Sequence, residues 1–342
     1  MDERRSLVAQ ALRGQAEGCR LLGSRLYGEL LDRAAADVER GGPAWRVFEP
    51  FADWTSESAY VLRVMGAVHR LVLTGGAAAL APHLVPGGDG AAAWPAFVAL
   101  LEQRGDELRE FALAHGVQTN EVGRCAVLAP AILQASRGMP LRLLEIGSSA
   151  GLNLRFDAYR YEDVWGPRDS PVALTGRYEG GPPPFPDGVA EIVERHGCDP
   201  APVDGASEDG RLTLLSYVWP DQAERMELLR GALDIAARMP VAVERAPAGE
   251  WLERELAEPR PGVATVVFHA IVWQYLDEAE RTRARAAIGA AGARAGADAP
   301  LAWVRMEPEG ELARVDATSW PGSQERLVAR AGYHGRPVRW LA

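Results

Sequence analysis

The stretch LRLLEIGSSAGLNLRF, residues 141–156, decides how the fold is interpreted. It begins as a short apolar run, reaches an acid at Glu145 and breaks into small residues bracketed by Gly147 and Gly151. It then resumes as a helix-like segment. Strand, glycine-bracketed turn and helix are the order of elements that brings a loop to the carboxyl edge of a parallel sheet. The stretch therefore predicts such a loop.

Two chemistries use a turn of this kind. The series Glu145-x-Gly147-x-Ser149-x-Gly151 approximates the acid-x-Gly-x-Gly-x-Gly loop that cradles S-adenosylmethionine (SAM). The pentapeptide GSSAG at 147–151 also matches G-x-S-x-G, the nucleophile elbow of serine hydrolases. The rest of the sequence has to decide between them.

The composition is that of an ordinary soluble globular protein, with 342 residues, 47% apolar and 25% charged. No apolar run approaches the roughly 20 residues that span a bilayer, and the first residues lack a signal-peptide core. The cysteines Cys19, Cys125 and Cys198 are scattered and form no C-x-x-C pair. These features predict a cytoplasmic protein without a membrane segment.

Charge and residue usage exclude several functions. A net charge of −10 opposes binding to nucleic acid phosphates, so a small-molecule substrate is expected. The chain has no lysine, which excludes a pyridoxal-phosphate Schiff base, a P-loop lysine and the kinase strand lysine. It also lacks H-E-x-x-H, paired-cysteine zinc spacing and an acidic calcium loop, so no metal site is predicted. Nothing in the sequence indicates the oligomeric state.

Apolar spacing predicts two domains. Residues 1–137 carry stripes near the 3.6-residue period, which predict a helical lid or substrate domain. From 138 to 342, short apolar runs alternate with helical patterns, which predicts an α/β, Rossmann-like, doubly wound and mostly parallel sheet. A hairpin insertion is expected near 160–188, and residues 171–178 are expected to form part of it. Segment 190–204 is expected to form a helix followed by a short edge segment. The expected strands are 141–146, 241–246, 262–273, 301–308 and 333–342, with helices at 221–239 and 277–291.

The serine-elbow interpretation lacks support upstream. In hydrolases of this type, strands and an oxyanion loop precede the nucleophile. Here the preceding residues look helical and contain no HGGG-like segment. Downstream, His269 or His334 can follow Asp221 or Glu244 to complete a triad with Ser149 in the required order. The serine-elbow interpretation is therefore weaker than the SAM interpretation but stays open.

The SAM interpretation gains support downstream. The flanking glycines allow close approach of the backbone, although Ser149 stands where the middle glycine usually lies. Asp199 is expected at the end of the second strand, where an acid faces the ribose. Glu244 is expected at the end of the third strand, near the adenine edge. His269 is expected where the fourth strand opens toward the substrate.

Six blocks in order resemble a bacterial protein family of unknown function: QTNEVGR, LLEIGSSAGLNL, YRY, GCDPAPVD, VWPDQAERMELL and VVFHAIVWQYL. The resemblance covers nearly the whole chain. The C-terminal part of this family is similar in layout to class I SAM-dependent methyltransferases. The resemblance thus implies a methyltransferase-type sheet behind a helical region, and Ser149 fits the family pattern.

The candidate site residues follow from these positions. The block QTNEVGR is either a capped helix start or part of the site, where Arg124 would grip the methionine carboxylate of SAM. Cofactor contacts are expected from Arg124, Glu145, Gly147, Ser148, Ser149, Gly151, Asn153, Asp199 and Glu244. Substrate contacts are expected from Asn120, Glu121, Tyr159, Trp219 and Trp273, although such aromatic residues are more often core.

The sequence thus favours a SAM-dependent methyltransferase that acts on an O or N of a small molecule. His269 is the expected base, because imidazole titrates near neutral pH. Two alternatives stay open. One is an esterase or acyltransferase using Ser149, and the other is a catalytically inactive ligand-binding protein of the same fold.

Overall fold

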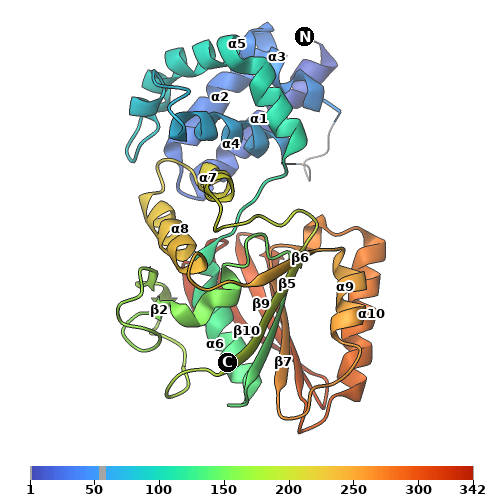
Figure 1. Ribbon diagram of the computed structural model, residues 1–342. Coiled ribbons are helices and arrows are strands. Elements are labelled where there is room, and N and C mark those ends of the chain that lie inside the picture. Colours follow the sequence, from blue (N-terminus) through green and yellow to red (C-terminus); the bar gives the residue numbers. More distant parts are fainter. Residues whose placement is uncertain (1, 54–58, 342) are drawn as a thin grey trace. The chain divides into compact units, whose positions relative to one another are not determined.

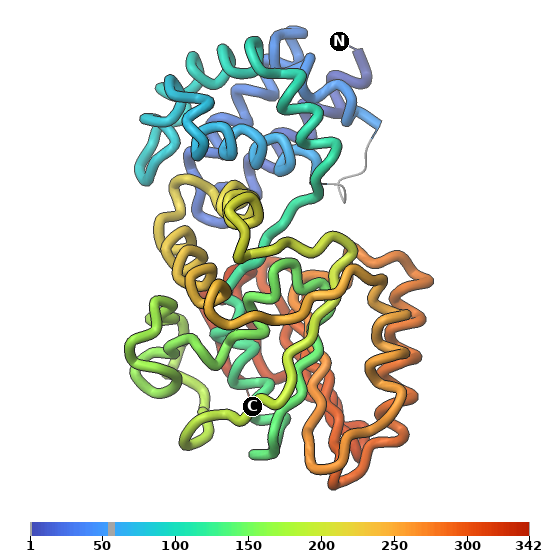
Figure 2. The backbone as a smooth tube through the Cα atoms, viewed as in Figure 1, coloured from blue at the N-terminus to red at the C-terminus, as the bar shows by residue number. Residues whose placement is uncertain are grey.

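The computed structural model describes residues 2–53 and 59–341, which form two compact units (Figure 1). The helical unit contains the residues up to Thr119 together with Ser207–Glu227. The sheet unit contains Asn120–Ala206 and the residues from Leu228 onward. Figure 2 traces the excursion of the chain from the sheet unit into the helical unit and back.

The helical unit confirms the expected helical character of the N-terminal region. Its helices are α1 (Glu3–Leu21), α2 (Arg25–Arg40), α3 (Pro43–Phe48), α4 (Tyr60–Leu73), α5 (Gly90–Ala114) and α7 (Glu208–Ser216), with 3-10 turns η1 (Glu49–Phe51) and η3 (Ala81–His83). Helix α8 (Ala223–Ala236) begins in this unit and ends in the sheet unit. Among the described residues, no helix is long and apolar enough to cross a membrane.

The VWPDQ block is part of the framework of the helical unit. Asp221 accepts hydrogen bonds from the hydroxyl of Ser24, at 2.7 Å, and from the backbone N–H of Leu26, at 3.2 Å. Because Ser24 is the N-cap of α2, Asp221 completes the start of that helix. Trp219 is buried beside the Tyr27 ring in the core of the same unit.

The sheet unit contains a nine-stranded sheet with the order β4-β11-β10-β9-β8-β7-β1-β5-β6. The strands β6, β5, β1, β7 and β8 are parallel, whereas β9, β10 and β11 continue the sheet as antiparallel neighbours and β4 pairs parallel with β11. The strands are β1 (Leu141–Ile146), β4 (Tyr178–Glu179), β5 (Ile192–Asp199), β6 (Ala242–Arg245), β7 (Ala264–Ala270), β8 (Leu301–Glu309), β9 (Leu312–Trp320), β10 (Gln324–Ala331) and β11 (Val338–Trp340). The expected α/β class and mostly parallel sheet are confirmed.

Helices cover both faces of this sheet. Helix α6 (Cys125–Ser136) packs on one face, against β7 and β8, after the 3-10 turn η4 (Val122–Arg124). Helices α9 (Ala248–Glu255) and α10 (Glu278–Arg294) lie side by side on the other (Figure 1). Leu144 and Val267 are register partners within the core of the α9/α10 face. Successive strand residues point to opposite faces, so Glu145 and its partner Phe268 point toward α6.

The expected helix in 190–204 is wrong, because Ile192–Asp199 is the eight-residue strand β5 between β1 and β6. Its polar residues resemble a helix surface in the sequence. In the sheet, Glu194 lies opposite Arg142 of β1 and binds it across the strands. Arg195 binds Asp157 at 2.7 Å. Partners distant in sequence thus let a polar segment form an internal strand.

The predicted hairpin is also wrong. Short strand β2 (Arg160–Tyr161) pairs with β3 (Ala173–Leu174) in parallel, which a hairpin cannot do, and β4 joins β11 instead.

The segment after β1 is the 3-10 turn η5 (Asn153–Ala158) rather than an α-helix. Strands β9 and β10 and helices α7 and α9 were not expected. The unit boundary lies after Thr119, so α6 belongs to the sheet unit although it precedes residue 138.

Candidate functional site

The loop after β1 adopts a left-handed backbone at three positions. Gly147, Ser149 and Gly151 have φ values of +66°, +54° and +66°. A Cβ atom on Gly147 would lie 2.5 Å from the Val272 side chain, and one on Gly151 would lie 3.0 Å from Val243. Glycine is therefore required for both conformation and packing. The loop touches the segment that follows β7, while β6 approaches its far end.

Side-chain contacts fix the loop in place. The Ser148 hydroxyl donates to the Glu145 carbonyl at 2.8 Å. The Asp199 carboxylate, at the end of β5, accepts from the Ser149 N–H at 2.9 Å and from the Ala201 N–H at 2.8 Å. Asn120 accepts from the N–H groups of 150 and 152, at 3.2 Å each. The loop is thus preorganised by three side chains that the sequence singled out.

Glu145 is a buried acid beneath this loop. Its Oε1 accepts a hydrogen bond from the Asn153 amide at 3.2 Å, and its Oε2 has no partner among the described residues. Burial raises the pKa of Glu145 to about 8, the Asn153 hydrogen bond opposes this, and the charge of Asp199 adds to it. The Cys125 thiol of α6 lies 3.3 Å from the Asn153 Oδ1. The carboxyl group of Glu145 is therefore held neutral at physiological pH.

The block QTNEVGR ties the loop region to the C-terminal part of the sheet unit. Glu121 begins η4, accepts from the Gly123 N–H and has its carboxylate 3.2 Å from the His334 Nδ1. The Arg124 guanidinium donates to the backbone carbonyls of Tyr333, at 3.1 Å, and Ala270, at 3.0 Å. These contacts hold the end of β7 near the start of α6.

His269 lies near the carboxyl end of β7, on the α9/α10 face. Its side chain is 1% exposed, and its Nδ1 lies 2.7 Å from the Glu307 Oε1. Trp273 stacks on the imidazole with the ring centroids 5.1 Å apart, and Trp303 lies 5.9 Å away. Burial disfavours ionisation of Glu307, but the His269 hydrogen bond and charge outweigh it and keep the Glu307 pKa below its usual value.

The remaining aromatic candidates lie in cores. Tyr159 is fully buried and its hydroxyl donates to the Leu152 carbonyl at 2.6 Å. Trp219 belongs to the core of the helical unit. Trp273 is half-buried and contacts another site residue, His269.

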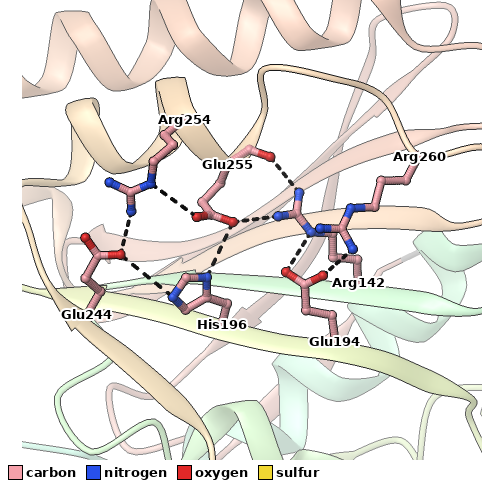
Figure 3. A network of polar contacts seen from close by, with 7 residues as sticks. All are labelled: Arg142, Glu194, His196, Glu244, Arg254, Glu255 and Arg260. Carbon is pink, nitrogen blue, oxygen red and sulfur yellow. Dashed lines mark hydrogen bonds and ion pairs between the residues drawn. The ribbon is translucent and has the colours of Figure 1, made fainter.

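Glu244 belongs to a separate ion-pair network on the α9/α10 face (Figure 3). This network joins Arg142, Glu194, His196, Glu244, Arg254, Glu255 and Arg260. Glu194, His196 and Glu255 bring ligand atoms within 4.8 Å of one another, a spacing that suits a metal ion. Arg142, however, binds both carboxylates while only 3% exposed, so a cation would have to displace a buried guanidinium. Arginines already neutralise the acids, and the network needs no metal.

The acids proposed for a serine triad have other partners. Asp221 caps α2 in the helical unit, and Glu244 binds Arg254. His269 binds Glu307 and His334 lies beside Glu121. The left-handed φ of Ser149 suits an elbow, yet no described contact joins these groups into a triad.

Glu307 is the main site residue that sequence reasoning missed. It lies at the carboxyl end of β8, two strands from β1, and accepts from His269 and from the N–H groups of Val272 and Trp273. An acid near the end of an expected strand was the signal that identified Asp199, and the same signal was present at 301–308. Arg155 was also missed. Its guanidinium donates to the carbonyls of Ala150 and Gly151 and steadies the β1 loop.

The fold and loop define an α/β protein with a doubly wound sheet and a glycine loop at its carboxyl edge. Residues 9–340 match the family described as an uncharacterized protein conserved in bacteria, DUF2332. The chain belongs to this family. No curated protein and no solved structure matches the chain significantly.

Proposed function

We propose that the sheet unit binds SAM at the carboxyl edge of β1, β5 and β7 and transfers its methyl group to an O or N of a small molecule. One observation carries this proposal. The loop bracketed by Gly147 and Gly151 follows β1, and Asp199 at the end of the neighbouring β5 binds that loop.

The strand order supports this position. From β1 the sheet grows through β5 and β6 on one side and through β7 and β8 on the other. The order therefore reverses between β1 and β7. In open α/β sheets, ligands bind outside the carboxyl ends of the strands at this reversal point. Gly147 packs against Val272 at this point, so the loops after β1 and β7 meet there.

The polar groups of the loop suit the ends of SAM. Each Asp199 oxygen accepts one backbone N–H, and a carboxylate offers about four acceptor positions, so capacity remains for the ribose hydroxyls. An ammonium group of SAM beside the Glu145 Oε2, which has no described partner, would favour the ionised form of this otherwise neutral acid. Arg124 donates to two backbone carbonyls, so we assign it to positioning the end of β7 rather than to the cofactor carboxylate. Glu244 binds Arg254, so we do not assign it to adenine.

SAM, when bound, supplies an electrophilic methyl group. The chain would contribute alignment of the acceptor and exclusion of water, since methyl transfer is an in-line displacement. The preorganised loop favours this role, because a fixed backbone loses little conformational entropy on binding.

Equilibrium dialysis of the full chain with tritium-labelled SAM tests the cofactor. We expect saturable binding that S-adenosylhomocysteine (SAH) displaces and that ATP and NAD⁺ do not. Incubation with a crude metabolite extract should then move label from SAM to small molecules. Displacement by ATP or NAD⁺ would indicate a different nucleotide ligand, and binding without any transfer would favour a non-catalytic member of the fold.

The left-handed backbone of Ser149 favours one other candidate, a serine esterase or acyltransferase. A fluorophosphonate probe should leave Ser149 unlabelled if the loop binds SAM. Covalent labelling of Ser149, abolished in Ser149→Ala, would support the hydrolase instead.

A further inference from the structure

We infer that His269 and Glu307 form an acid–base pair, with the imidazole Nε2 accepting a proton from a hydroxyl group of the methyl acceptor. The inference rests on the proposed function for the identity of the reaction. The pairing itself rests on contacts within the sheet unit, and it identifies the acceptor class as alcohols or phenols.

The contacts of Glu307 fix which ring nitrogen carries the proton. Its Oε1 accepts from the backbone N–H of Val272 at 3.1 Å and of Trp273 at 3.2 Å, and it lies 2.7 Å from the His269 Nδ1. An ionised carboxylate only accepts hydrogen bonds, and the Glu307 pKa lies below its usual value. Nδ1 therefore donates. In the neutral ring, Nε2 then carries the lone pair.

Two buried atoms of this pair lack partners among the described residues. They are the Nε2 of His269 and the Oε2 of Glu307. Buried polar atoms are nearly always hydrogen-bonded, and an exception needs an explanation such as a catalytic role. The His269 side chain is 99% buried, since its exposed fraction is 1%. A hydroxyl hydrogen of a bound acceptor would satisfy Nε2.

Trp303 of β8 and a short segment after β7 cover the His269 ring. Trp273 stacks on the ring and belongs to η6 (Trp273–Tyr275), a single 3-10 turn in which no residue is buried. Arg281 of α10 holds this turn by donating to the carbonyls of Trp273 and Gln274. Ile271, just before the turn, has φ +57°, which is strained for a β-branched residue. Segments with few buried contacts open at low free-energy cost.

The same segment reaches the glycine loop. Val272 donates its backbone N–H to Glu307, and its side chain packs closely against Gly147. The acid–base pair and the loop proposed to hold SAM are therefore joined by one residue. Opening of the turn at Trp273 would uncover Nε2 beside the proposed methyl donor.

The proton balance gives the acceptor class. As the acceptor oxygen forms its bond to the methyl carbon, the S–CH₃ bond breaks and its electron pair stays on sulfur. Nε2 takes the hydroxyl proton and His269 later releases it to water. A hydroxyl oxygen gains most from such a base, because the neutral O–H is a weak nucleophile. An amine already has a free electron pair when neutral and needs no base to react.

The first experiment reads the tautomer by NMR of full-length protein labelled with ¹⁵N-histidine. The variant His269→Gln assigns the His269 signals among the six histidines. In the neutral ring we expect Nδ1 to be protonated and Nε2 to have the shift of an unprotonated nitrogen. Glu307→Gln keeps an oxygen for the two backbone N–H groups but removes the charge, so the Nδ1–H signal should move to higher field. A protonated Nε2, or an unchanged Nδ1–H signal in the variant, would overturn the inference.

The second experiment tests whether Nε2 can be reached. Diethylpyrocarbonate modifies unprotonated imidazole nitrogens, and mass spectrometry locates the modified residues. His115 is exposed and His69 is buried in the helical unit, so they are internal references. His269 should react faster than His69 and slower than His115, and Arg281→Ala should accelerate it. Reaction as slow as that of His69 in both proteins would mean that His269 is a sealed core residue. Neither experiment uses SAM, so this failure is distinct from a failure to bind the cofactor.

Discussion

Two histidine clusters lie on the same face of the sheet and differ in how their polar atoms are satisfied. In the network around His196, the acids Glu194 and Glu255 bind Arg142, and the acids gain further arginine partners (Figure 3). In the pair of His269 and Glu307, one nitrogen and one carboxylate oxygen are buried without described partners.

This difference separates a structural cluster from a candidate functional one. Arginines balance the acids around His196, so the network links β1, β5 and α9 without needing a ligand. Unsatisfied buried atoms are unfavourable for stability and are common where a ligand completes the contacts. The metal-like spacing of Glu194, His196 and Glu255 is therefore less informative than the lone Nε2 of His269.

The largest effect on stability is expected in the satisfied network. Arg142→Ala leaves the Glu255 and Glu194 carboxylates without their buried partner, and breaking such a pair costs about 3–5 kcal/mol of unfolding free energy. Arg260→Ala is the matched control. Its side chain is 48% exposed and binds the same Glu194, so its loss should cost about 1 kcal/mol or less. Urea denaturation measures both. Equal losses would show that burial does not distinguish these two arginines.

A pH-dependent effect is expected at Glu145, the unsatisfied acid beneath the glycine loop. Burial raises its pKa to about 8, so the folded chain keeps a proton that the unfolded chain releases near pH 4.5. The stability contribution is full below pH 4.5 and falls as pH rises to about 8, by up to about 1.4 kcal/mol per pH unit. Glu145→Gln should remove this decline.

Urea denaturation compares the wild type with Glu145→Gln between about pH 5 and about pH 9. This range covers most of the expected decline in stability and the plateau above it. Glu110→Gln, a change at an exposed acid, should reproduce the wild-type pH profile. Parallel profiles for all three proteins would mean that Glu145 is ionised in the folded chain.

The sequence predicts much of the sheet and part of the site. Local patterns suffice for β1 and for its glycine loop, because both depend on neighbouring residues. They fail for β5, whose polar residues are satisfied by Arg142 and Asp157 from elsewhere in the chain. They also fail for the tryptophan of the VWPDQ block, Trp219, which packs in the core of the helical unit. Partners distant in sequence determine the structure of β5 and the position of Trp219, and the apolar periodicity of the sequence carries no information about such partners.

The central claim is tested most directly by isothermal titration of SAH into wild type, Asp199→Ala and Glu244→Ala. Both acids end neighbouring strands, but Asp199 binds the glycine loop while Glu244 binds Arg254. We expect one site per wild-type chain. Asp199→Ala should weaken binding by at least about tenfold, which corresponds to about 1.4 kcal/mol. Glu244→Ala should leave the affinity unchanged. Absence of SAH binding to the wild type at millimolar concentration, or unchanged affinity in a folded Asp199→Ala protein, would contradict the proposed site.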